Sequence, residues 1–180
     1  MDRVAEMPAA GGAAVFEAGD AVVHPHHGAG MVVSRSQRRL LGRAAQSYLE
    51  IEFADGALRI MVPCDAARTV GLRPVAGRGL VARISGVLES SPQSVPGTWS
   101  ARLKHYRELL KGGDVLTLAA AVRDLAPRGT RSGLSSSERE FYQRARETLA
   151  SELRYALDVD LDHAFAYIDE RIARRPPPVA

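Results

Sequence analysis

Residues 48–62 read Tyr-Leu-Glu-Ile-Glu-Phe-Ala-Asp-Gly-Ala-Leu-Arg-Ile-Met-Val, and this stretch decides the fold of the first part of the chain. Apolar residues alternate with polar ones on both sides of Asp55-Gly56, which is the two-residue period of a half-buried strand. Asp-Gly between two such runs is a strong hairpin signal. The stretch therefore predicts two antiparallel strands joined by a two-residue turn, whose buried face consists of Leu49, Ile51, Phe53, Leu58, Ile60 and Val62.

Further short strands are expected on either side of this hairpin. Ala21–His24 follows a turn, Met31–Val33 follows a break at Gly28–Gly30, and Thr69–Leu72 can add a last strand. About five short strands within residues 15–75 are typical of a small closed or nearly closed barrel. Residues 1–14 show no periodic pattern and are interpreted as a flexible tail.

After Pro74 the apolar residues recur with the period of a helix. Ser135–Glu138 has the pattern of a capping box that opens the longest helix, and Pro127–Gly133 is interpreted as a basic loop. We expect an α+β fold in which the β-barrel of residues 15–75 is followed by an all-helical domain of residues 76–174 and a Pro-rich tail of residues 175–180. The apolar stripes of the predicted helices lie within Leu80–Leu88, Trp99–Leu110, Val115–Leu125, Phe141–Leu157 and Leu161–Ile172, and the fourth of these helices begins at the capping box.

The composition is that of an ordinary globular protein, with 46% hydrophobic and 25% charged residues. No apolar run approaches the roughly 20 residues that span a bilayer, and Met1–Glu6 lacks the apolar core of a signal peptide. Cys64 is the only cysteine, so no internal disulfide can form. These features favour a cytoplasmic protein with no membrane partner. We also expect the protein to be a monomer.

Three histidines within four residues, His24, His26 and His27, are the first cluster that suggests a metal. Pro25 fixes the backbone between them, and adjacent side chains diverge in an extended chain. A structural turn is therefore favoured over a metal site, and Cys64 is better interpreted as a half-buried thiol than as a nucleophile. Asp158, Asp160 and Asp162 alternate like calcium ligands, but no glycine or closing glutamate follows at the required places, so they are interpreted as a helix-capping acidic loop. The sequence contains no nucleophile elbow and no phosphate-binding glycine loop, so we expect no enzyme, no metal and no cofactor.

The positive charge is concentrated in the predicted helical domain. The whole chain carries a net charge of +3, whereas residues 99–154 contain eleven basic and seven acidic side chains, a net +4. Arg139, Arg144 and Arg146 lie on the predicted capping-box helix, where Arg139 and Arg146 share a face. These arginines either contact phosphates without sequence preference or form ion pairs with neighbouring acids.

Trp99 is the only tryptophan, and it stands at a predicted helix start behind the N-cap Thr98. A helix N-terminus attracts phosphate, and a large flat ring flanked by basic residues can wedge against base edges in the minor groove. Its spacing from Leu103, Tyr106 and Leu110 equally fits a buried residue at the head of an apolar stripe. From spacing alone the buried position is favoured, because tryptophan is usually mostly buried.

Five segments, in their order along the chain, resemble the CarD–CdnL family of transcription regulators, whose barrel module also occurs in transcription–repair coupling factors. The resemblance covers about residues 16–157 and implies a Tudor-like barrel that binds the β subunit of RNA polymerase. It also implies a helical domain that contacts promoter DNA at the upstream edge of the transcription bubble. The segments are Phe16–Gly30, Leu58–Pro63, Thr98–Tyr106, Gly113–Leu125 and Leu134–Arg146.

The resemblance also assigns individual residues. The family tryptophan that wedges into the minor groove corresponds to Trp99, and basic DNA-contacting positions correspond to Arg102 and Lys104. This implication reverses the preference drawn from spacing and favours a DNA role for Trp99. Ala101 stands where some relatives have a basic residue.

Two polymerase-facing positions of the family are found in the barrel. One corresponds to Arg38, after the second predicted strand. The other, an arginine in some relatives, corresponds to Met61, and Arg59 lies two residues earlier on the same strand face. The predicted polymerase site is therefore Arg38, Arg59 and Met61.

The sequence as a whole predicts a non-enzymatic regulator that binds the polymerase β subunit and stabilises the open promoter complex, without reading the DNA sequence. Such a protein is associated with the nucleoid through RNA polymerase. One alternative is a polymerase-binding adaptor that does not contact DNA, in which Trp99 is buried. Another is a metal-dependent enzyme that uses His24, His26 and His27.

Overall fold

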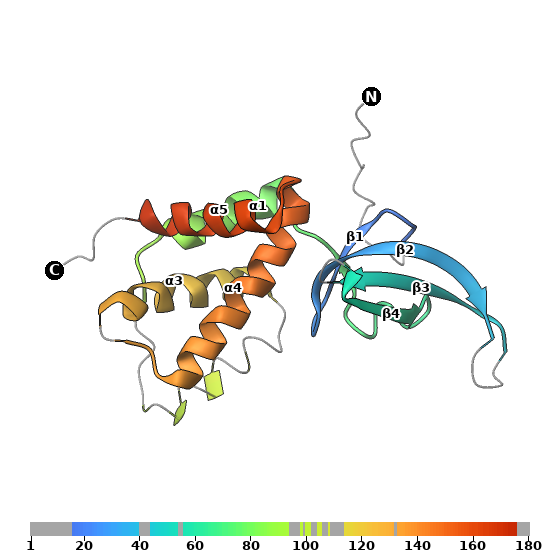
Figure 1. The fold of residues 1–180 in the computed structure, drawn as a ribbon, viewed down its shortest axis with the longest axis horizontal. Helices are drawn as coiled ribbons and strands as arrows, with labels where there is room; N and C mark the ends of the chain where they lie inside the picture. The colour runs from blue at the N-terminus through green and yellow to red at the C-terminus, as the bar shows by residue number, and fades with distance from the viewer. Residues whose placement is uncertain are drawn as a thin grey trace.

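A computed structural model describes residues 16–39, 44–53, 56–93, 98, 100–101, 104–105, 108, 114–131 and 133–175, with only the backbone of 127–131. Figure 1 shows two lobes, a curved sheet built by the first part of the chain and a group of helices built by the second. Each lobe has its own cluster of buried apolar residues. The predicted α+β fold, with strands before helices, is confirmed.

The sheet lobe is an antiparallel sheet in the order β4-β3-β2-β1-β5. The first four strands follow one another as hairpins, and β5 returns to pair with β1. Leu49, Ile51 and Phe53 are buried, as the alternation predicts, and so is Val62. The prediction is wrong for Leu58, which is 39% exposed at the start of β4 on the edge of the sheet, and Ile60 is only half-buried. The strands are β1 (Ala21–His24), β2 (Gly28–Arg38), β3 (Gln46–Phe53), β4 (Leu58–Pro63) and β5 (Arg73–Pro74).

The hairpin between β3 and β4 exists, but the predicted two-residue turn is wrong. Phe53 pairs with Leu58, so the connection consists of residues 54–57. Gly56 has a φ of +92°, a conformation that glycine adopts at little cost. The Asp-Gly signal therefore located the reversal but not its length.

Gly28–Gly30 is not a break, because these residues are the first three of β2. Gly28 has a φ of +75° where the chain turns into the strand. Gly30 faces Phe53 on β3, and a Cβ at Gly30 would lie 2.6 Å from that ring. The register shifts between Val32 and Ser34, which leaves Val33 as an extra, partly exposed residue. Such a bulge increases strand twist and fits the curvature of β2 in Figure 1.

Thr69–Leu72 is not a strand either. Residues 64–71 form turns that carry Ala67 and Leu72 into the sheet core. The last strand is instead Arg73–Pro74, where Val22 pairs with Pro74 and Val23 with Arg73. The alternating apolar residues of 69–72 were misleading because turn residues also supply the sheet core.

The helical lobe contains α1 (Arg78–Glu89), α3 (Val115–Arg131), α4 (Ser136–Leu157) and α5 (Leu161–Ala173). Residues 100, 101, 104, 105 and 108, within the predicted Trp99–Leu110 segment, are also helical. The predicted apolar stripes of α1, α3 and α4 supply the buried cluster of this lobe. The predicted capping box is confirmed, since Ser135 and Glu138 bond each other's backbone amides.

The basic loop predicted at Pro127–Gly133 is wrong for most of its length, because α3 continues to Arg131. Proline inside a helix removes one backbone hydrogen bond and its ring crowds the carbonyl of residue i−4, although its fixed φ is compatible with a helix. The turns before it are anchored by Val122 and Leu125, both fully buried. That packing sets the helical path before the proline is reached. None of the described helices is both long and apolar enough to cross a bilayer.

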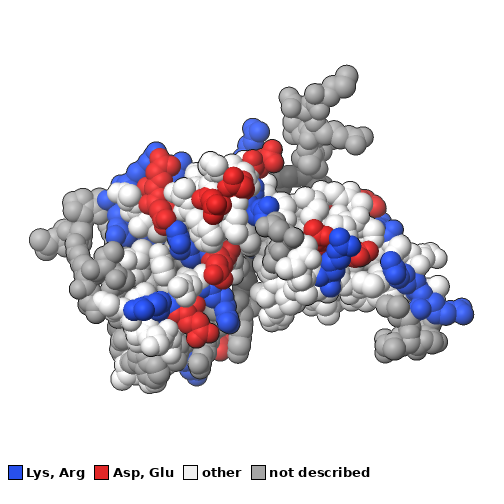
Figure 2. Space-filling model, in the orientation of Figure 1, with Lys and Arg blue, Asp and Glu red and all other residues white. Residues whose placement is uncertain are grey.

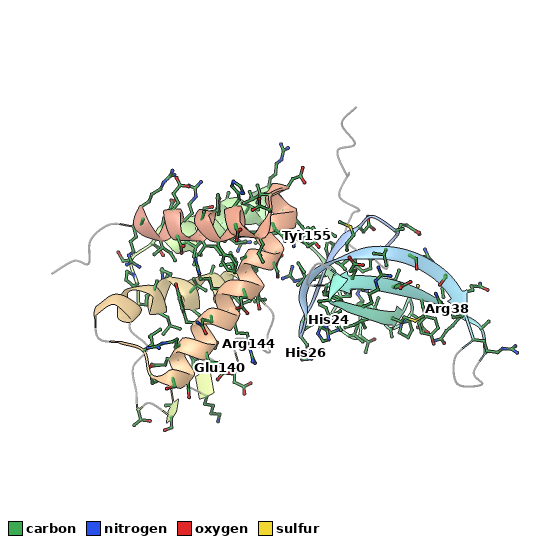
Figure 3. All side chains as sticks on the ribbon, viewed as in Figure 1. His24, His26, Arg38, Glu140, Arg144 and Tyr155 are labelled. Atoms are coloured by element: carbon green, nitrogen blue, oxygen red, sulfur yellow. The ribbon has the colours of Figure 1, made fainter. Side chains whose placement is uncertain are left out.

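Helix α4 is the element shared by both lobes. It packs against α3 and α5 in the helical lobe and against β2 in the sheet lobe. Figure 3 shows Tyr155 where α4 comes nearest the sheet, with His24 and His26 at the adjacent end of the sheet. Arg38 lies at the opposite, free end of the sheet. The free end of the sheet and the outer helices therefore point away from each other.

Candidate functional site

The three predicted polymerase-binding residues lie on one face of the sheet. Arg38 pairs with Gln46 across β2 and β3, while Arg59 and Met61 pair with Glu52 and Glu50 across β3 and β4. Directly opposed residues of an antiparallel pair project from the same face, and so do alternate residues of one strand. The arrangement expected for Arg59 and Met61 is therefore confirmed, and Arg38 shares their face.

These residues have different electrostatic surroundings. Arg59 donates to Glu52 Oε2 from Nε at 2.9 Å, and its Nη1 lies 3.6 Å from Glu50 Oε1. Arg38 is exposed and donates from Nε to Ser36 Oγ at 3.2 Å. Six strand positions separate Gln46 from Glu52, so Arg38 and Arg59 are about 20 Å apart at roughly 3.3 Å per residue. The face presents a basic end beside Arg38 and a patch around Arg59 in which one guanidinium faces two carboxylates.

Arg38 belongs to a larger basic group at the free end of the sheet. Arg39 follows it and is also exposed. Figure 2 shows Lys and Arg side chains gathered at this end, whereas basic and acidic side chains are interleaved over the visible face of the helical lobe. Among the described residues, none forms an ion pair with Arg38 or Arg39. The free end of the sheet can therefore accept an acidic partner without breaking a described ion pair.

The three arginines of α4 do not have equal freedom. Arg139 is exposed, and no described residue pairs with its guanidinium. Arg144 is 65% exposed and lies 3.5 Å from Glu140 one turn earlier. Arg146 is 27% exposed, donates to Asp169 Oδ2 at 2.6 Å and stacks 4.7 Å above the centre of the Phe165 ring. Arg139 and Arg144 project to solvent, while Arg146 connects α4 to α5.

Trp99 and Arg102, the two positions most directly implied for DNA contact, lie outside the described residues. Lys104 is described and exposed. The Thr98 hydroxyl accepts from the amide of Ala101 at 3.4 Å, as expected of the predicted N-cap. Whether Trp99 is buried or presented outward stays a prediction.

The chain that leads toward Trp99 is held on α3 by a buried ion pair that the sequence did not reveal. Arg123 donates to Asp124 Oδ1 and Ser90 Oγ, each at 2.7 Å. Asp124 also accepts from the amide of Gln93 at 2.7 Å. These bonds fix residues 90–93 only a few positions before Trp99. Adjacent opposite charges within an otherwise apolar helix were the one sequence signal for this pair.

The histidine cluster forms part of the packing and hydrogen bonding at the turn between β1 and β2. His24 is buried, its Nδ1 accepts from the amide of His26 at 3.2 Å, and its ring lies 6.1 Å from that of Phe53. Burial, with smaller effects from His27 and His26, lowers the pKa of His24 below its ordinary value. In the described part of the chain, no group of three His, Cys, Asp or Glu side chains is placed to hold a metal ion. Cys64 is half-buried, as predicted.

Three further residues at the junction of the lobes were missed from the sequence. Glu152 and Ser151 on α4 contact Arg73 and the start of β2. Glu152 lies three residues after Leu149, on the apolar side of α4, and a carboxylate at such a position is a signal that sequence reasoning could have used. The sequence could not have identified its partner, which is 79 residues away.

Comparisons with known proteins divide the chain at the same place as the fold. The model of the CarD-like/TRCF RID domain matches residues 16–76, the sheet lobe, and that of the CarD C-terminal domain matches residues 83–169, within the helical lobe. The chain is also 27% identical, over 139 residues, to a Bacillus subtilis (strain 168) protein described as "Putative transcription factor YdeB". That alignment covers 77% of this chain and 90% of the relative.

Proposed function

Because this chain belongs to the CarD family of transcription-associated proteins, we propose that it binds the β subunit of RNA polymerase through its sheet lobe and promoter DNA through its helical lobe. The observation that carries the proposal is the presence of both family domains, one after the other, as the two lobes of one chain. The protein acts as a monomer without enzymatic activity, in the cytoplasm, and reaches the nucleoid by way of RNA polymerase.

The polymerase contact is formed by the sheet face that contains Arg38, Arg59 and Met61. Arg38 supplies an exposed guanidinium, which can grip a carboxylate with two parallel hydrogen bonds. Strand β4 is an edge of the sheet, so its outer backbone groups can extend pairing into a partner strand. Met61 is partly buried and adds an adaptable apolar contact beside Arg59.

The DNA contact is formed by Trp99, Arg102, Lys104 and the arginines of α4. Arg139 and Arg144 reach phosphate most easily, because the exposed Arg144–Glu140 pair is worth little and can be exchanged. Arg146 contributes less directly, since its guanidinium is engaged with Asp169 and Phe165. Phosphate contacts of this kind do not select a sequence, so polymerase chooses the promoter.

Trp99 has the decisive role in this mechanism. An aromatic wedge at the edge of the melted region occupies the space that reannealing strands need. The polymerase contact raises the effective concentration of the DNA-binding lobe at that place, so a weak DNA contact is sufficient. A longer-lived open complex can raise or lower transcription, depending on which step limits the promoter.

The test is the lifetime of the open promoter complex formed by polymerase with the wild-type chain or with Trp99→Ala. Aromatic contacts to bases are worth about 1–3 kcal/mol, so Trp99→Ala should shorten the lifetime by roughly 5- to 150-fold. Trp99→Phe should retain part of the effect, and Arg174→Ala, at the far end of α5, is the matched surface control. An unchanged lifetime with Trp99→Ala would favour the adaptor that does not contact DNA.

The polymerase contact is tested separately by binding to the purified β subunit. Arg38→Glu should weaken binding, because it reverses the charge of an exposed guanidinium on the proposed docking face. Arg68→Glu makes the same change at an exposed position in the turn between β4 and β5 and serves as the control. Equal losses in both variants would point to a general charge effect and refute a specific contact at Arg38.

A further inference from the structure

Glu152 is a carboxylate enclosed at the junction of the two lobes. Its side chain is 3% exposed and accepts two hydrogen bonds from Arg73 on β5, Nη1 to Oε1 at 2.7 Å and Nη2 to Oε2 at 2.8 Å. Oε1 also accepts from the backbone amide of Ala76 at 2.9 Å. One side chain of α4 therefore binds a strand of the sheet lobe and the segment that connects the lobes.

A second contact beside the first joins α4 to the start of β2. Ser151 Oγ accepts from the amide of Ala29 at 3.2 Å and donates to the carbonyl oxygen of Thr148 at 2.7 Å. Gly28 permits the close approach, because a Cβ at that position would lie 2.8 Å from Ser151 Oγ. Strands β2 and β5 are thus attached to consecutive residues of the same helix.

The connecting segment itself has little freedom to act as a hinge. The Ala76 side chain is buried in the helical core, while its amide is bound by Glu152. The amide of Val75 donates to the carbonyl oxygen of Ala21 on β1 at 3.4 Å. Residues 73–76 are therefore bonded to both lobes in turn, and rotation between the lobes requires breaking the Glu152 contacts.

Stability alone is a poor reason to place a carboxylate here. A buried ion pair contributes little net stability compared with apolar residues of similar size, because both charges lose their hydration. Its hydrogen bonds are, however, strict in direction, and the two-point contact with Arg73 fixes an angle as well as a distance. This geometry suits a joint whose orientation matters.

We propose that Glu152 and Arg73 are positioning residues that hold the two lobes at one fixed angle, so that polymerase and promoter DNA are engaged together. The functional half of this inference rests on the proposed function, whereas the fixed angle does not. With a rigid joint, attachment of the sheet lobe holds the DNA-binding lobe at a high effective concentration near the bubble. With a loose joint, each lobe binds its partner but the two contacts no longer reinforce one another.

The fixed angle is tested by ¹⁵N NMR relaxation on the full chain, which reports the rotational correlation time of each lobe. In the wild type both lobes should tumble with one correlation time. The double variant Arg73→Gln/Glu152→Gln removes the ion pair without leaving an unpaired buried charge, and its lobes should tumble with shorter, unequal times. The single variant Glu152→Gln tests the same contact, and Glu147→Gln, exposed on the same helix, is the control.

Unchanged chemical shifts within each core would establish that the variant lobes remain folded. If the folded double variant keeps one shared correlation time, the proposed joint is refuted. If the double variant is too unstable to measure, Ser151→Ala loosens the second contact alone, and hydrogen exchange at Ala29 and Ala76 should then accelerate together. Unchanged exchange at Ala76 in Ser151→Ala would refute a single coupled joint.

The functional half is tested by comparing two measurements on the same double variant. Affinity for the β subunit should stay within about twofold of wild type, while the extension of open-complex lifetime should fall at least about tenfold, since tethering supplies gains of 10²–10⁴. If affinity for the β subunit and the extension of open-complex lifetime fall together, the junction only supports the fold and its proposed positioning role is refuted. Should Trp99→Ala leave the lifetime unchanged, the proposed function fails, but the relaxation result still decides whether the joint exists.

Discussion

The ion pair that secures the segment before Trp99 gives a sharp prediction. Arg123→Met replaces a guanidinium whose side chain is 8% exposed with an apolar side chain of comparable length. The substitution removes the bonds to Asp124 Oδ1 and Ser90 Oγ. The Asp124 carboxylate, which is 12% exposed, then keeps one hydrogen bond among the described residues, the one from the amide of Gln93.

The expected loss in the free energy of unfolding follows from the burial of this ion pair. Breaking a buried ion pair by removing one partner costs about 3–5 kcal/mol, because the other charge stays buried. We expect a loss of about 3 kcal/mol in the free energy of unfolding, since Asp124 keeps the Gln93 amide. Asp124→Asn should also cost about 3 kcal/mol, because it leaves the Arg123 guanidinium, 8% exposed, without its charged partner. The double variant should lose clearly less than the sum of the two, because no buried charge remains.

The assay is urea unfolding of the four chains, followed by far-ultraviolet circular dichroism and by the fluorescence of the single tryptophan. The double-mutant cycle should give a coupling energy of at least about 1 kcal/mol, within the range for residues in contact. Hydrogen exchange at Gln93 should accelerate in Arg123→Met. Additivity within about 0.5 kcal/mol would show that Arg123 and Asp124 act independently and refute the ion pair as the anchor of residues 90–93.

Four further predictions concern stability. Gly30→Ala should destabilise the sheet lobe by about 1–3 kcal/mol, because a Cβ there would lie 2.5 Å from the carbonyl oxygen of Glu52. Gly86→Ala, exposed on α1 with open space around it, should stabilise the protein by about 0.5–1 kcal/mol. In urea unfolding, a gain in stability for Gly30→Ala or a loss for Gly86→Ala would contradict the corresponding expectation. The lowered pKa of His24 means that the unfolded chain takes up a proton first as pH falls. Stability from the neutral ring is therefore complete above about pH 6.5 and decreases as pH falls toward the lowered pKa. His24→Asn should remove this pH dependence from the unfolding free energy, and an unaltered slope would assign it to other groups. Ser135→Ala should lower the unfolding free energy, measured by thermal unfolding, by about 1 kcal/mol through loss of the capping box. Ser136→Ala, measured in the same way, should have little effect.

Prediction from sequence was most successful where a residue's environment depends on its near neighbours. The alternation of residues 48–53 placed Leu49, Ile51 and Phe53 in the core, and the pattern Ser135–Glu138 fixed the start of α4. These signals arise from the periods of strands and helices and from caps within one turn. They also allowed Arg59 and Met61 to be assigned to one face before the structure was known.

Prediction of where strands and helices begin or end failed at places where residues distant in sequence stabilise the backbone. Gly28–Gly30 resembles a break, yet it is strand because Phe53 and Ser151 occupy the space that side chains at those glycines would need. Pro127 resembles a helix end, yet α3 continues because the preceding turns are anchored in the core. In both cases tertiary packing overrides a correct local preference.

The sequence by itself determined that strands precede helices, most of the residues that fill each core and the candidate basic residues, because these depend on periodicity along the chain. Only the tertiary structure decided which charges on separate elements meet. Arg146 bonds Asp169 on another helix, while Arg139 on the same face of α4 remains open to solvent. Glu152 meets Arg73 across 79 residues of chain. Ion-pair geometry depends on how separate elements pack, and no local pattern encodes that packing.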